Sequence, residues 1–163
     1  MIDELYSSGW FGVSQTTSVS VYKPTTMKRA GIWLDFREAF VIDLSGDSPS
    51  TTRIASGIED FHVKGGARSK TPYGPMDKTS ESKFLERRLH QTREYFTHIL
   101  ELVGEAEELY LFGPAEAKVQ LHKEIEHRRS FRPAVLSIET ADKMTDRQKI
   151  ARAKAFFDSF SAS

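Results

Sequence analysis

The feature that most constrains the fold is a stretch of 12 residues, Lys64 to Pro75, that can be neither helix nor strand. It has three glycines, two prolines and no hydrophobic period. It follows an apolar run typical of a strand and precedes a long amphipathic helix, so we expect it to project from one end of a packed core. Loops longer than about 12 residues are usually functional or disordered. The stretch therefore predicts the position of a site without giving its chemistry.

The apolar patterns before and after this loop predict different arrangements of secondary structure. Before it, runs separated by short turns predict an antiparallel meander, whereas after it helical and strand patterns alternate. Pro114 is expected in the first turn of the second helix, and Thr145 with Gln148 matches a capping box at the start of the last. The predicted elements are strands at 30–36, 38–44 and 51–61, a helix at 80–103, a strand at 109–112, a helix ending near 129, a strand at 134–138 and a helix from Thr145.

The long helix has apolar residues at three- and four-residue spacings, which predicts one continuous buried face. These residues are Phe84, Leu85, Leu89, Phe96, Ile99, Leu100 and Val103.

The predicted order βββαβαβα places the chain in the α/β class. A strand–helix–strand crossover makes the fourth and fifth strands parallel, so the sheet is mixed and helices cover both faces. This order is that of the ribonuclease H-like fold.

Composition excludes several classes of function. The sequence has no cysteine, which rules out disulfides, zinc thiolate sites and thiol catalysis and favours a reducing compartment, so we expect a cytoplasmic protein. No apolar run is long enough to span a membrane, and we expect no secretory signal. Residues 1–29, rich in Ser and Thr, are expected to form a flexible extension, with Met27 as a possible alternative start, and residues 30–163 a single domain.

The zero net charge hides two segments of opposite sign. Residues 62–93 carry eight lysines and arginines against three acids, a net charge of +5, whereas residues 94–126 carry two against eight, a net charge of −6. A positive end would attract a phosphate-rich partner, although charged faces of this kind also occur as simple solvated helix surfaces. The candidate contacts for such a partner are Lys64, Gly65, Gly66, Arg68 and Lys70 of the loop and Lys83, Arg87 and Arg88 on one face of the helix.

Other candidate sites have simpler interpretations. Asp35 ends the first strand, where a two-metal nuclease would place a carboxylate, but no acid ends the fourth strand, so we expect Asp35 to form a turn with Arg37. His122 and His127 are five residues apart, off the helical step that places two ligands on one face. We therefore predict no catalytic residue, metal site or cofactor.

The ordered features resemble the central domain of archaeal and eukaryotic peptide-release factors and their Pelota relatives. They are the meander, the Lys64-Gly65-Gly66 loop, the helix with Arg87 and Arg88, and the strand ending in Gly113-Pro114. Small bacterial proteins of this type, called translational machinery proteins, are similar over about residues 28–160. The resemblance implies a ribonuclease H-like fold and a loop that, as Gly-Gly-Gln in release factors, enters the peptidyl-transferase centre. Position 67 is Ala instead of Gln, so we expect no stop-codon-dependent release. The resemblance implies that the candidate loop and helix residues bind RNA, with a ribosome or a tRNA as the partner, and we expect no DNA or membrane partner.

Two other hypotheses stay open at this stage. A rescue factor of the peptidyl-tRNA hydrolase type would use the Gly-Gly loop with water and substrate groups alone. A protein-interaction module would instead bind through its acidic helices, for example through Glu105 and Glu108.

Overall fold

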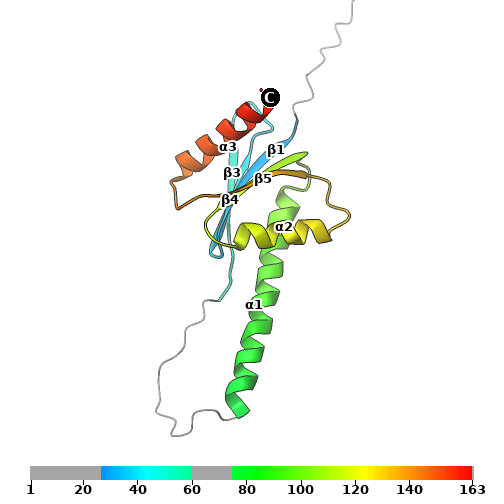
Figure 1. Ribbon diagram of the computed structural model, residues 1–163, viewed down its shortest axis with the longest axis vertical. Helices are drawn as coiled ribbons and strands as arrows, with labels where there is room; N and C mark the ends of the chain where they lie inside the picture. Colours follow the sequence, from blue (N-terminus) through cyan, green and yellow to red (C-terminus); the bar gives the residue numbers. More distant parts are fainter. Residues whose placement is uncertain (1–26, 60–74, 163) are drawn as a thin grey trace, which may run out of the picture.

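A five-stranded mixed sheet forms the centre of the molecule (Figure 1). The computed structural model describes residues 27–59 and 75–162. Neighbouring strands follow the order β3-β2-β1-β4-β5; the pairs β1/β2 and β2/β3 are antiparallel, and β1/β4 and β4/β5 are parallel. The elements are β1 (Arg29–Leu34), β2 (Glu38–Asp43), β3 (Ser50–Ala55), α1 (Pro75–Leu102), β4 (Glu108–Gly113), α2 (Ala117–His127), β5 (Ala134–Thr140) and α3 (Asp146–Ser161).

Helices cover both faces of the sheet, because the central strands are apolar on both sides. In β1, Ile32 and Leu34 face α1 and α2, whereas Trp33 faces α3. Ile32 and Leu34 are fully buried, and Trp33 is 3% exposed. The predicted α/β class, the order βββαβαβα, the mixed sheet of the ribonuclease H-like type and the helices on both faces are therefore confirmed.

Element boundaries differ from the predicted ones most clearly at three places. Helix α1 begins at Pro75, so the expectations that it begins at residue 80 and that Pro75 belongs to the loop are wrong. β3 ends at Ala55, earlier than the predicted end at Phe61, which lies outside the described residues. The second helix begins at Ala117, so the expectation that Pro114 occupies its first turn is wrong. The reason is the backbone before it: Gly113 has φ 145° and Ala115 has φ 53°, which are not helical values, and the helix begins only after them.

The long helix α1 is buried over less of its length than predicted. Phe96, Ile99, Leu100 and Val103 pack against the sheet, but Leu85 is 52% exposed and Leu89 59% exposed. Figure 1 shows the physical reason, because the first half of α1 extends beyond the edge of the sheet. The apolar period of the sequence continues there, but the sheet does not.

Helix α3 begins as predicted and is fixed to the sheet by a polar network. The Gln148 amide nitrogen donates to Thr145 Oγ1, and the Thr145 amide donates to Gln148 Oε1, so the capping box is confirmed. Tyr110 of β4 donates its hydroxyl hydrogen to Glu139 of β5 at 2.7 Å, and Arg152 of α3 donates to both. Burial raises the pKa of Tyr110 to about 12, while the hydrogen bond from Tyr110, followed by that from Arg152, lowers the pKa of Glu139. These groups hold α3 against the edge strand β5.

Candidate nucleic-acid interface

The projecting half of α1 carries two of the predicted RNA-binding cations on one surface. Lys83 and Arg87 are four residues apart, one above the other on the helix, and both side chains are exposed. They line an open hollow of about 750 Å³ together with Glu86, His90, Gln91 and Glu94, so the hollow has two acids beside its lysine and arginine. Arg87 Nη1 lies 4.0 Å from Glu59 Oε2, and both side chains are more than half exposed. Such a pair is weak in water, so the guanidinium can exchange Glu59 for another anion.

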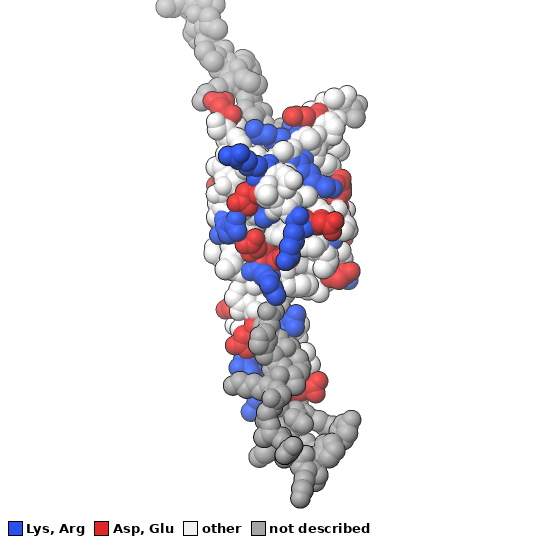
Figure 2. All heavy atoms as spheres, turned by 90° about the vertical axis from the view of Figure 1, so that its left-hand side faces the viewer, with Lys and Arg blue, Asp and Glu red and all other residues white. Residues whose placement is uncertain are grey.

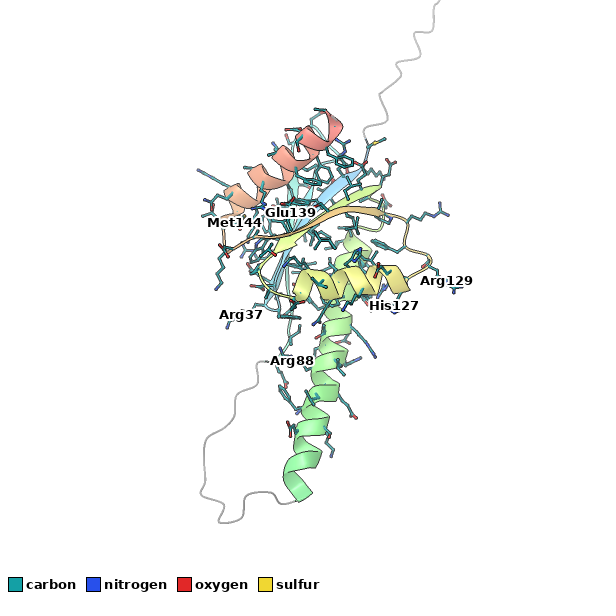
Figure 3. The ribbon with its side chains drawn as sticks, viewed as in Figure 1. Arg37, Arg88, His127, Arg129, Glu139 and Met144 are labelled. Atoms are coloured by element: carbon teal, nitrogen blue, oxygen red, sulfur yellow. The ribbon has the colours of Figure 1, made fainter. Side chains whose placement is uncertain are left out.

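Arg88 lies to the side of this hollow. Its side chain is half-buried, its backbone oxygen accepts a hydrogen bond from Thr92 Oγ1 at 2.8 Å, and it is not among the residues that line the hollow. In Figure 3 it stands on α1 below the sheet. Of the three helix cations that the sequence predicts as a single face, the structure therefore brings Lys83 and Arg87 together and separates Arg88 from them.

The predicted loop residues fall outside the described part of the chain. They are Lys64, Gly65, Gly66, Arg68 and Lys70. Their role in RNA binding stays a prediction.

The carboxylate of Asp35 has the structural role that we expect from the sequence. Its Oδ1 accepts hydrogen bonds from the backbone amides of Arg37 at 2.7 Å and Glu38 at 2.8 Å, which closes the turn between β1 and β2. The Asp35 carbonyl in turn accepts from the Tyr95 hydroxyl of α1 at 3.0 Å. Burial, followed by the nearby charge of Asp35, raises the pKa of Tyr95 far above its ordinary value, so this hydroxyl stays a donor.

His122 and His127 of α2 have separate partners. His122 Nδ1 lies 3.9 Å from Glu126 Oε1, while His127 Nδ1 is hydrogen-bonded to the backbone oxygen of Lys123 at 2.6 Å. Within residues 27–59 and 75–162, no group of three or more His, Asp or Glu side chains could hold a metal ion. In the same part of the chain, no helix has the length and apolar content needed to cross a membrane.

The acids proposed for a protein-interaction module already have partners. Glu105 pairs with Lys28 at 2.8 Å, and Glu108 pairs with Arg29 at 2.8 Å. The hydrogen bond and the charge of Lys28 lower the pKa of Glu105. The Arg29–Glu108 pair is largely buried and holds the start of β1 beside β4, which makes Glu108 a poor candidate for a docking surface. The side chain of Glu105 is 88% exposed, so its pair with Lys28 is weak in water.

Sequence reasoning missed a group of charged and aromatic residues at the end of the sheet where β1 turns into β2. Lys149 of α3 is 3% exposed, and its Nζ lies 3.8 Å from the centre of the Trp33 ring. Arg53 of β3 donates to Glu38 and to both carboxylate oxygens of Asp146, which joins the sheet to the start of α3. One signal was available in the sequence, because Lys149 stands four residues before Ala153 and eight before Phe157 on the buried stripe of α3.

Comparison with known proteins finds distant similarity among solved structures. No protein-family model matches the chain, and no curated protein matches it. Among solved structures, the chain is similar to an archaeal translation termination factor, aRF1, with 12% sequence identity and a TM-score of 0.38. The match covers 83% of this chain and 40% of the factor, so the chain spans less than half of that protein's length. At this level of similarity, only the chain's own residues can support a function.

Proposed function

We propose that this chain is a ribosome- or tRNA-associated translation protein that contacts RNA through the basic Gly-Gly loop and the adjoining face of α1. The RNA-contacting residues are Lys64, Gly65, Gly66, Arg68 and Lys70 of the loop and Lys83, Arg87 and Arg88 of the helix. Ala67 takes the place of the Gln that release factors carry, so the protein binds without stop-codon-dependent release.

The observation that carries this proposal is the projection of α1 beyond the sheet. Burial of α1 begins at Tyr95, and the helix begins at Pro75. At about 1.5 Å per residue, the 20 residues from 75 to 94 reach about 30 Å past the packed part of the helix. The predicted loop precedes Pro75 at this far end of the helix. Lys83 and Arg87 lie on the projecting part of α1, and their charged groups are exposed to solvent. The loop and the projecting part of the helix, residues 64–94, together carry eight lysines and arginines against four acids. A narrow projecting element with this excess of positive charge suits entry into a crevice of a large polyanion.

The test is co-sedimentation of the purified protein with ribosomes across a salt series, paired with binding to labelled tRNA. Two double variants remove cations from the proposed interface: Arg68→Ala with Lys70→Ala in the loop, and Lys83→Ala with Arg87→Ala on the helix. Each phosphate contact that is lost should weaken binding and reduce the slope of log affinity against log salt by about 1. We expect both variants to bind less tightly than the wild type and with a shallower salt slope.

A matched control removes the same charge elsewhere. Lys123→Ala with Arg129→Ala takes two exposed cations from the region of α2, and Figure 3 shows Arg129 on the opposite side of the molecule from Arg37. This variant should bind like the wild type. If no protein pellets with ribosomes or binds tRNA at low salt, or if the control weakens as much as the interface variants, the proposal is wrong.

A further inference from the structure

A pocket of about 340 Å³ opens at the end of the sheet, on the face that α3 covers. Its walls come from the β1–β2 turn, from the end of β3, and from the segment that leads into α3. Cations outnumber acids among the lining residues, four to two. The residues that matter for its chemistry are Trp33, Arg37, Glu38, Arg53, Lys143 and Lys149.

Lys149 brings a buried positive charge to this pocket. Its Nζ lies 3.5 Å from Asp146 Oδ1 and 3.7 Å from Glu38 Oε1, both longer than the roughly 2.7–2.9 Å of a hydrogen bond between charged groups. The aromatic faces of Trp33 and Phe40 stabilise the ammonium at 3.8 and 4.9 Å. The ammonium is therefore paired with the carboxylates of Asp146 and Glu38 at longer range than a charged hydrogen bond, and it lines the pocket as a buried positive charge.

The acids around the pocket are held by other partners. Arg53 donates to Glu38 Oε2 at 2.9 Å and to the two oxygens of Asp146 at 3.0 and 2.8 Å. The Asp35 carboxylate accepts from two backbone amides of its own turn. Arg53 offsets the charges of Glu38 and Asp146, and the two amides hold the Asp35 carboxylate in its turn. Arg37 and Lys143 are exposed and line the same pocket.

Trp33 is a residue of the pocket wall whose hydrogen-bonding capacity the described residues leave unused. Its buried indole Nε1–H has no hydrogen-bond partner within the described part of the chain. Such groups are rare in folded proteins because each costs about 1–3 kcal/mol. Because Trp33 Nε1 is covered by other protein atoms, a ligand would first contact the exposed Arg37 and Lys143. Trp33 nevertheless places a fluorescent reporter directly against Lys149.

A short segment after β3 connects the pocket to the surface proposed to bind RNA, and the two share none of the lining residues that the structure describes. The Ser56 amide donates to the Arg37 carbonyl at 2.8 Å, and three residues later the Glu59 amide donates to Gln91 Oε1 of α1 at 3.1 Å. Gln91 lines the same hollow as Arg87. Arg37 and Arg88 lie on the same side of the molecule in Figure 3, and Figure 2 shows cations among acids from the body of the molecule down onto the helix.

We infer that this pocket binds a phosphate group, and that the group belongs to the backbone of the RNA that α1 contacts. Arg37 and Lys143 receive the phosphate at the edge, and the buried ammonium of Lys149 attracts it from within. This assignment rests on the proposed function, but it concerns residues that the loop and α1 do not supply. A free nucleotide offers the same chemistry and is distinguished by the test.

The test uses Trp33 as a reporter in a Trp10→Phe background, because the sequence has only two tryptophans. The probes are a labelled single-stranded oligoribonucleotide, a nucleoside monophosphate and inorganic phosphate. We expect the RNA to change Trp33 fluorescence at concentrations at least 10-fold lower than either small molecule. Arg37→Ala with Lys143→Ala should weaken RNA binding about 5- to 30-fold and flatten the salt slope, whereas Lys123→Ala with Arg129→Ala should not.

The outcomes separate this inference from the proposed function. If the small molecules change Trp33 fluorescence as readily as the RNA does, the pocket takes a free phosphate compound and the assignment to RNA is wrong. If RNA does not change Trp33 fluorescence and the Arg37→Ala, Lys143→Ala variant binds RNA like the wild type, the inference about the pocket is wrong. The proposed function still holds in that case if Lys83→Ala with Arg87→Ala weakens RNA binding. If neither double variant affects RNA binding, both this inference and the helix contact are wrong.

Discussion

Gly113 is a position at which the fold leaves no room for a side chain. Its φ is 145°, and a Cβ atom built there would lie 2.3 Å from the backbone oxygen of Leu34. Because that oxygen belongs to the neighbouring strand β1, it can move only with the sheet. We predict that Gly113→Ala destabilises the protein by about 2–4 kcal/mol, from backbone strain and the displacement of β1 together, as measured by urea unfolding.

Gly46 provides the matched control for this substitution. A Cβ there would meet only the Ser48 oxygen, at an ordinary 3.6 Å. Gly46→Ala should therefore change the free energy of unfolding by less than about 0.5 kcal/mol. Equal effects at the two positions would contradict the close approach of β4 to β1.

Single residues were predictable from the sequence where their partners lie nearby in the chain. Asp35 closes a turn with amides two and three residues away, and Thr145 caps a helix with Gln148. Lys149 was not predictable in this way. Its position over Trp33 depends on the packing of α3 against a strand more than 100 residues earlier, and no local pattern reports that contact.

At the scale of the elements, α1 shows what periodicity can and cannot predict. The spacing of Leu85, Leu89, Phe96 and Leu100 indicates correctly that they share one side of a helix. It does not indicate how far the sheet extends beneath that side, which depends on where β1 to β5 end. The prediction of a fully buried face was therefore right for the second half of α1 and wrong for the first.

This difference within α1 can be measured by two equivalent substitutions. Leu100 is 2% exposed, so Leu100→Ala should cost about 2–5 kcal/mol of stability through lost burial and a cavity. Leu89 is 59% exposed, so Leu89→Ala should stay within about 0.5 kcal/mol of the wild type. Urea unfolding of both variants checks the prediction, and a large loss for Leu89→Ala would mean that the first half of α1 is covered in solution.

For the whole molecule, the sequence predicted the order of elements better than their assembly into sites. The four strands other than β3 and the three helices have apolar patterns of their own, and parallel pairing follows from the crossover through α2. The pocket at the end of the sheet draws Arg37, Arg53 and Lys143 from three separate segments. Only the strand order β3-β2-β1-β4-β5 brings these segments together, and that order is a property of the complete fold.

The division into an extension and a single domain leads to a prediction about the chain as a whole. We propose that the domain folds without residues 1–26. A variant that begins at Met27 keeps Lys28, whose carbonyl accepts from the amides of Glu107 and Glu108, and Arg29, which pairs with Glu108. Its urea midpoint should match that of the full chain, with one cooperative transition.

A second variant, beginning at Ala30 behind an initiator Met, tests the reason for this boundary. It loses the Lys28 carbonyl, which accepts at 2.7 Å from Glu107, and leaves the partly buried carboxylate of Glu108 without its guanidinium at 2.8 Å. Because unpaired groups at a strand end cost about 1–3 kcal/mol, this variant should unfold at a lower urea concentration than the Met27 variant. If the Met27 variant were the one to lose stability, residues 1–26 would belong to the domain. If the two variants unfolded together, the contacts of Lys28 and Arg29 would contribute nothing to the attachment of β1 to β4.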